Sequence, residues 1–305
     1  NSMANVSFDL TDITSVMTPD LVRKLASVSL MHRGRYSGRM RGERRSTKWG
    51  QSIEFADYRD YSPGDDLRRV DWNLYARSDR LYVKLMEEEE DRTVRLVLDT
   101  SNSMGFGTPS KISMAAGLAA SLGYVALNDL DNLVVVEPST QGYTSSRRLR
   151  GRAGFRELLS MLASCRPSGK VNLERLLTRL ASGLRRTELL VVISDLMEAG
   201  DVHRGLRRLR GRGSEVVLLH VLSRDEIEPQ IADGQFELID SETGEAISIR
   251  ADNDALERYV LELQSWLNGI RDTCKAVGIT YLQVISDQDI EQILFDDLRR
   301  LKVLE

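Results

Sequence analysis

Strands and helices alternate along the chain from residue 93 onward, and this alternation restricts the fold more than any other feature. Apolar runs of strand length occur at 94–98, 133–136, 189–193, 216–221 and 279–285. Segments with helical apolar spacing or composition occupy 111–127, 153–164, 172–184, 201–211, 253–277 and 290–301. Such alternation predicts an α/β fold with a mainly parallel, Rossmann-like central sheet and helices on both faces.

Two of the predicted strands end in an aspartate. Val94–Leu98 runs directly into Asp99, and Leu189–Ile193 runs through Ser194 into Asp195. In an open parallel sheet, ligands bind beyond the carboxyl ends of the strands. We therefore expect both carboxylates to lie at one crevice along this edge.

The loop after Asp99 carries hydroxyl groups at alternate positions. It reads Asp99-Thr100-Ser101-Asn102-Ser103, so the acid and both serines can converge on one point. Hard oxygen donors of this kind suit Mg²⁺ or Mn²⁺. The pattern predicts a metal site made by Asp99, Ser101, Ser103 and Asp195, with Asn102 available to a binding partner. The alternative is that Asp99 and the serines only cap the helix that follows.

The residues around this loop carry a family resemblance. DTSNSM after a buried strand resembles the metal-ion-dependent adhesion site of von Willebrand factor A domains, and VVISD resembles their later acidic loop. The run EFADYRDYSPGDDLRRVDWNLYAR at 54–77 is more specifically similar to the DUF58 family, in which such a segment precedes a von Willebrand A-like domain. The resemblance covers roughly residues 35–303. It implies a non-enzymatic protein-binding or adaptor module that works with a MoxR-type AAA+ ATPase, or with its client, in assembly or maturation of other proteins.

One position departs from the adhesion-site pattern. A threonine between the two motifs normally completes the metal shell, but here the stretch SGKVNL at 168–173 places Val171 at that position. Valine cannot coordinate a cation, which puts the metal in doubt. Ser168 is one possible substitute. The alternative is that the ammonium of Lys170 lies where a cation would be and neutralises the two aspartates, so Lys170 is also predicted to take part in partner binding.

Three regions are expected along the chain. Residues 1–48 comprise an N-terminal helix and a basic arm, and residues 49–92 form a strand-rich appendage that contains GDDLRRVDWN. Residues 93–303 form the α/β domain. A hairpin insertion is expected around 235–250, because two apolar alternating segments flank the turn sequence SETG.

The first region combines a predicted helix with a basic arm, and the function of that arm has two interpretations. An apolar stripe predicts a helix at about 10–31 with Thr11 as its cap. The arm at 33–48 is rich in arginine and glycine. A charge run of this kind is typical of a solvated segment, and nucleic-acid binding is the alternative.

The appendage contains a cluster of charged and aromatic residues. Arg69, Trp72 and Arg77 are the residue types that protein-binding hot spots favour. The alternative is that Trp72 anchors the appendage on the α/β domain while the charges pair around it. The cluster is therefore predicted either to bind a partner or to hold the two regions together.

Composition excludes several other classes. The net charge is −4, and the only cysteines are Cys165 and Cys274, which form neither a disulfide framework nor a metal motif. No apolar run approaches the roughly 20 residues of a membrane helix, and the start lacks a secretory pattern, so a cytoplasmic location is expected.

An enzyme is the main alternative to a binding module. A metal-dependent hydrolase or phosphoryl-transfer enzyme of the D-x-D type needs a second acid where this chain has Ser101. The sequence also lacks the G-x-S-x-G and phosphate-loop patterns. We therefore expect no catalytic residue at the predicted site.

Overall fold

The computed structural model describes residues 15–31, 53–63, 65, 67, 70–88, 92–139, 142–185, 188–197, 201–209, 214–229, 234–239, 246–251 and 253–305. Residues 36–91 form one compact unit, and the segments before and after them form a second, larger one. The predicted site belongs to the larger unit.

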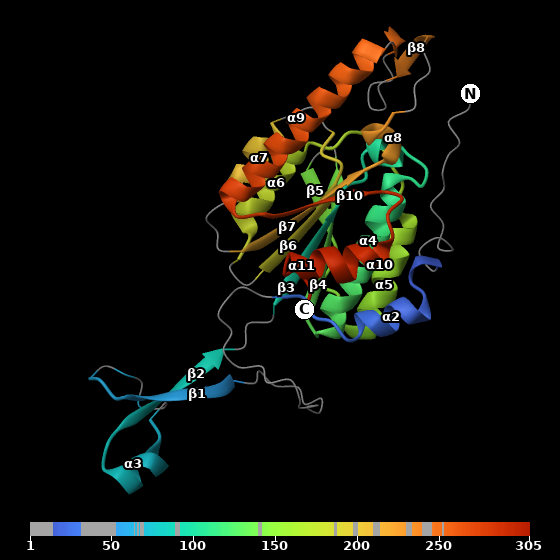
Figure 1. Cartoon of the computed structure of the whole chain (residues 1–305). Coiled ribbons are helices and arrows are strands. Elements are labelled where there is room, and N and C mark those ends of the chain that lie inside the picture. The colour runs from blue at the N-terminus through green and yellow to red at the C-terminus, as the bar shows by residue number, and fades with distance from the viewer. Residues whose placement is uncertain are drawn as a thin grey trace. The chain divides into compact units, whose positions relative to one another are not determined.

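Six described strands form the central sheet of the larger unit (Figure 1). In spatial order they are β10 (Thr280–Ile285), β7 (Glu215–Leu222), β6 (Glu188–Ser194), β3 (Thr93–Leu98), β4 (Asn132–Ser139) and β5 (Gly142–Ser145). The first five run parallel, and β5 pairs antiparallel with β4 at the edge. The prediction of a mainly parallel α/β sheet is confirmed. The edge strand β5 was not predicted.

Helices cover both faces of the sheet (Figure 1). One face packs against α2 (Pro19–Leu25), α4 (Lys111–Asn128), α5 (Gly151–Ser164) and the C-terminal series α10 (Ile290–Gln292), a π-helical turn (Ile293–Asp297) and α11 (Leu298–Arg300). The other face packs against α6 (Leu173–Gly183), α7 (Val202–Arg208) and α9 (Asn253–Val277).

The apolar strands explain this two-sided packing. Side chains alternate between the faces of a strand, so Leu96 and Leu98 join the first helical layer while Val97 joins the second. Every residue of β6 is buried. A strand covered on both faces is predominantly apolar, which is why β3 and β6 read as nearly unbroken apolar runs.

The helix expected at 10–31 is divided, because residues 15 and 16 are helical and a separate helix, α2, begins after Thr18. Helix α2 spans Pro19–Leu25, and its cap is Thr18, whose hydroxyl accepts a hydrogen bond from the backbone N of Leu21. Proline suits the first turn of a helix, where its missing N–H has no partner to lose. Thr11 lies outside the described residues. Leu21 and Leu25 pack in the core of the larger unit.

The remaining elements are small. The short helix α8 (Arg224–Ile227) follows β7, and β8 (Gly234–Ile239) pairs antiparallel with β9 (Ala246–Ala251), at the position of the expected hairpin. In the smaller unit β1 (Ile53–Asp60) pairs antiparallel with β2 (Tyr82–Glu88), and α3 (Trp72–Ser78) lies between them in the sequence. Among the described helices, none has the length and apolarity needed to cross a bilayer.

Candidate functional site

Asp99 follows β3 at the carboxyl edge of the sheet and is 1% exposed. Its Oδ1 accepts a hydrogen bond from the backbone N of Ser101 at 2.9 Å, and its Oδ2 accepts one from the hydroxyl of Ser194 at 2.6 Å. Burial, and then the nearby charge of Asp195, raise the pKa of Asp99 to about 6. Asp99 is therefore a buried acid, and each of its carboxylate oxygens accepts a hydrogen bond.

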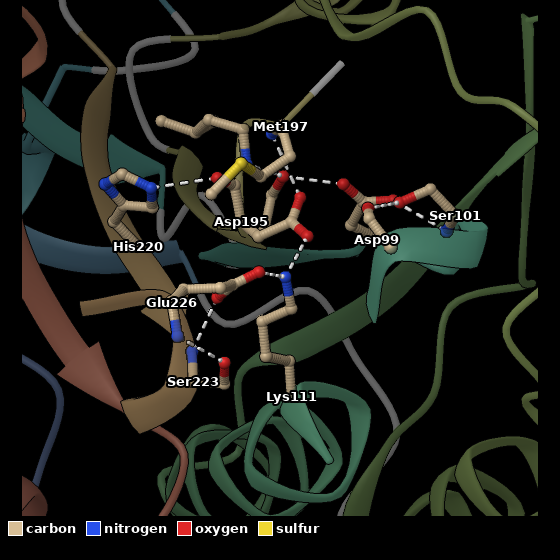
Figure 2. Close-up of polar contacts among 11 residues, drawn as sticks. Asp99, Ser101, Lys111, Asp195, Met197, His220, Ser223 and Glu226 are labelled. Atoms are coloured by element: carbon tan, nitrogen blue, oxygen red, sulfur yellow. Dashed lines mark hydrogen bonds and ion pairs between the residues drawn. The ribbon is translucent and has the colours of Figure 1, made fainter. Parts of the chain in front are cut away.

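Asp195 follows β6 and is also 1% exposed. Leu196 adopts a left-handed conformation with φ of 55°, and the chain turns so that the backbone N of Met197 donates to Asp195 Oδ1 at 3.1 Å. Asp195 Oδ2 accepts from the Nζ of Lys111 at 2.7 Å. Figure 2 shows the carboxylates of Asp99 and Asp195 side by side at the strand ends.

The two predicted serines lie next to Asp99. The backbone N of Ser101 donates to Asp99, and Ser103 belongs to the 3₁₀ helix η2 (Asn102–Gly105). Their hydroxyl oxygens are 3.0 Å apart and hydrogen-bonded to each other, and both residues are buried. The structure thus brings Asp99, Ser101, Ser103 and Asp195 to one edge of the sheet.

Lys111 is a central residue of this edge that the sequence does not predict. It is the first residue of α4, and its side chain is fully buried. Its ammonium donates to Asp195 and also to Glu226, and it lies 5.9 Å from the centre of the Phe106 ring (Figure 2 shows the two ion pairs). A buried ammonium needs such partners, because an unpaired charge is strongly disfavoured in the protein interior.

Glu226 and Ser223 connect Lys111 to the end of β7. They form a capping box at α8, in which the Ser223 hydroxyl accepts from the backbone N of Glu226 and a Glu226 oxygen accepts from the backbone N of Ser223. Since the other oxygen of Glu226 binds Lys111, this one lysine connects the loops that follow β3, β6 and β7.

His220 is a neutral side chain that holds the loop after β6. Its Nε2 is 2.9 Å from the carbonyl oxygen of Asp195, and its Nδ1 is 2.9 Å from the hydroxyl of Tyr281. A carbonyl oxygen can only accept, so Nε2 carries the proton and Nδ1 accepts from Tyr281. Burial lowers the pKa of His220 to about 4. An imidazole that stays neutral at pH 7 in this way holds the Asp195 loop and carries no charge there.

These residues do not fit a divalent cation as they are arranged. A cation between Asp99 and Asp195 would lie beside the ammonium of Lys111, whose positive charge repels it. The carboxylate oxygens already accept hydrogen bonds, and the two serine hydroxyls bind each other. Apart from this predicted set of two acids and two serines, the described part of the chain brings no three His, Cys, Asp or Glu side chains together where they could hold a metal.

A family model described as "Protein of unknown function DUF58" matches residues 57–264. The chain belongs to this family. The DUF58 chain is 26% identical over 278 residues to the uncharacterised protein Rv1480 of Mycobacterium tuberculosis, a match that covers 89% of this chain and 86% of the relative. The uncharacterised protein Mb1516 of Mycobacterium bovis matches with the same figures.

Solved structures similar to the DUF58 chain include an aerotolerance-related membrane protein from Bacteroides fragilis. That match has 17% identity and a TM-score of 0.42, and covers 69% of this chain and 98% of the other. The SpRpn10 VWA domain matches with 10% identity and a TM-score of 0.39, covering 68% of this chain and 95% of that domain.

The loop before α6 contains Lys170, whose ammonium is one alternative source of positive charge beside the two aspartates. The loop lies against the Asp99 loop, because the backbone N of Asn102 donates to the Gly169 carbonyl at 3.1 Å and the backbone N of Ser168 donates to the Thr100 carbonyl at 2.7 Å. Lys170 is exposed, and Val171 is buried in the core. The ammonium that pairs with Asp195 belongs to Lys111, and the role of Lys170 in partner binding stays a prediction.

The residues predicted for partner binding in the appendage are only partly described. Trp72 begins α3 and is 56% exposed, with its ring edge-to-face against Tyr75. Arg77 is also exposed, and Arg69 lies outside the described residues. Both interpretations of this cluster stay predictions, and the basic arm at 33–48 also lies outside the described residues.

Gly107, in the loop between β3 and α4, lies close to Ser223, in the loop before α8. Substituting Gly107 tests the contact between these two loops. Gly107 has a φ of 94°, and an added Cβ would lie 2.6 Å from the Cβ of Ser223. Gly107→Ala is expected to lower the free energy of unfolding by about 1–3 kcal/mol, measured by urea denaturation. Gly151→Ala is the matched control, because Gly151 has a φ of 55° with no atom within 4 Å of an added Cβ. Equal losses in the two variants would show that the contact with Ser223 is unimportant.

Proposed function

We propose that this DUF58 protein is a non-enzymatic adaptor that binds a protein partner at the carboxyl edge of its central sheet. The family resemblance implies a MoxR-type AAA+ ATPase, or a client of one, as that partner. Binding at this edge agrees with the general location of ligand sites in open parallel sheets. The proposal gives the Asp99 and Asp195 loops the role of a rigid platform for the partner.

One observation carries the proposal. Phe106, on the loop between β3 and α4, is 50% exposed, and Met197, on the loop after β6, is 37% exposed. These two loops also hold the buried acids. Exposed aromatic residues and methionine beside a firmly held polar network are typical of the apolar core of a protein interface.

The polar groups below these side chains support binding without turnover. Asp99 and Asp195 are almost inaccessible, Lys111 is ion-paired to two carboxylates, and His220 is neutral. A general acid or base must reach the proton that it transfers. These groups therefore act better as internal support than as catalysts.

The proposal is tested with the chain and the MoxR-type ATPase of the same genome. The double variant Phe106→Ala with Met197→Ala is expected to weaken their complex about 10- to 100-fold, because each side chain supplies on the order of 1 kcal/mol at an interface centre. Binding is measured by biolayer interferometry with ATP present.

Leu130→Ala is the matched control for this test. Leu130 is 72% exposed, but it precedes β4 and so lies at the opposite edge of the sheet. The control is expected to bind like the unmodified chain. Equal weakening by the control and the double variant, or phosphatase turnover abolished by Asp99→Asn, would contradict the proposal.

A further inference from the structure

We propose that Lys111 takes the place of a divalent cation in this adhesion-type site, so that the site is complete without a metal. The inference concerns the cation of the site and holds whichever partner binds there. It rests on three observations: the position of the lysine, the hydrogen bonds already made by the oxygens around Asp99, and the valine that stands where a threonine ligand is expected.

The ammonium of Lys111 lies where the charge of a cation is needed. Its Nζ is 2.7 Å from Asp195 Oδ2 and contacts Glu226 as well, with the side chain at 0% exposure. A second cation bound to Asp195 would meet this fixed positive charge at short range and in a poorly screened interior.

Helix α4 holds the lysine in this position. The backbone N of Lys111 donates to the Phe106 carbonyl at 3.1 Å, and the 18-residue helix packs into the core from its first turn, where Ile112 is 1% exposed. If Lys111 turned outward, Asp195 and Glu226 would lose their counter-charge. Backbone, packing and ion pairs thus all hold the lysine in the site.

The oxygen donors around Asp99 are also committed to the protein. Asp99 accepts from Ser101 and Ser194, while the hydroxyls of Ser101 and Ser103 bind each other. Val171, which stands at the threonine position, is 3% exposed and packs in the apolar core. A divalent cation would have to share these oxygens with their present hydrogen-bond partners and would still lack the threonine ligand.

The functional consequence is a partner-binding edge that does not depend on divalent cations. In a metal-dependent adhesion site, a partner carboxylate completes the coordination of the ion. Here the positive charge is internal and already paired, so the partner would contact the surface residues of the edge. Chelators would then leave the complex intact.

The test is a Mn²⁺ titration followed by electron paramagnetic resonance of the free ion. Three proteins are compared: the unmodified chain, Lys111→Met, and Lys111→Met combined with Asp99→Asn. The single variant is expected to bind one Mn²⁺ at least about tenfold more tightly than the unmodified chain, because Asp195 loses its ammonium. The added Asp99→Asn is expected to return the affinity to that of the unmodified chain, which separates the site from adventitious surface binding.

Equal Mn²⁺ affinities of the unmodified chain and Lys111→Met, whether strong or weak, would overturn the inference. If Lys111→Met does not fold, the unmodified chain still decides the matter. Its Tm is expected to be the same in Mn²⁺ and in EDTA. A rise in Tm with Mn²⁺ that is absent in Asp99→Asn would overturn the inference.

Discussion

Replacing Lys111 by methionine is expected to lower the free energy of unfolding by about 3–5 kcal/mol, because removing one partner of a buried ion pair leaves the other charge without compensation. Methionine fills a similar volume, so the loss of charge dominates over the loss of packing. Asp195, at 1% side-chain exposure, and Glu226, at 13%, would both lose their cation. Urea denaturation at pH 7 measures the effect.

The control for this measurement is Lys24→Met. Lys24 also pairs with an acid, Glu291, but its side chain is 54% exposed. Exposed ion pairs contribute little because water and salt screen them. The control is therefore expected to unfold almost like the unmodified chain. If both variants lost the same small amount of stability, Lys111 would not be the ion-paired centre of the three loops.

Asp99 is expected to make the stability of the chain fall as the pH rises from about 4 to 7. The pKa of Asp99 is raised from 3.8 to about 6 in the folded chain, so the native state binds the proton more tightly than the unfolded state. The contribution of Asp99 to stability is therefore fully present below pH 4 and is lost as the pH passes 6. Its size is on the order of 3 kcal/mol, from the free energy that corresponds to a shift of about two pKa units.

Asp99→Asn isolates this effect from all other titrating groups. The amide keeps an oxygen for the backbone N of Ser101 and carries no charge beside Asp195. The difference in unfolding free energy between Asp99→Asn and the unmodified chain is expected to shift in favour of the variant by about 2–3 kcal/mol between pH 4 and pH 8. A difference that stays constant over this range would mean that Asp99 is not a buried acid beside another carboxylate.

The fold was largely predictable because burial on two faces leaves a simple pattern. Strands such as β3 and β6 are apolar at most positions, and the two aspartates come directly after or close after these runs. The four-residue edge strand β5 has no such signal, since GYTS is short and mostly polar. The start of α2 depends on Thr18 and Pro19, which an apolar stripe alone does not reveal.

Lys111 could not be found from the sequence, because its partners are distant along the chain. Asp195 is 84 residues away and Glu226 is 115 residues away. The sequence offers Lys170 as the alternative source of charge, because it lies next to the expected threonine position. Only the parallel order of β3, β6 and β7 brings the start of α4 to both acids. The sequence does contain one signal, since Lys111 is the first residue of a helix that is otherwise almost entirely apolar or small.

A crystal structure of the chain grown with Mn²⁺, with anomalous data collected for manganese, tests the central claim most directly. That claim is that the acids at the ends of β3 and β6 form a closed site whose cation is the ammonium of Lys111. The account predicts no anomalous peak between Asp99 and Asp195, and Lys111 Nζ within hydrogen-bonding distance of Asp195. A manganese peak coordinated by Asp99, Ser101 and Ser103, with Lys111 displaced from Asp195, would contradict it.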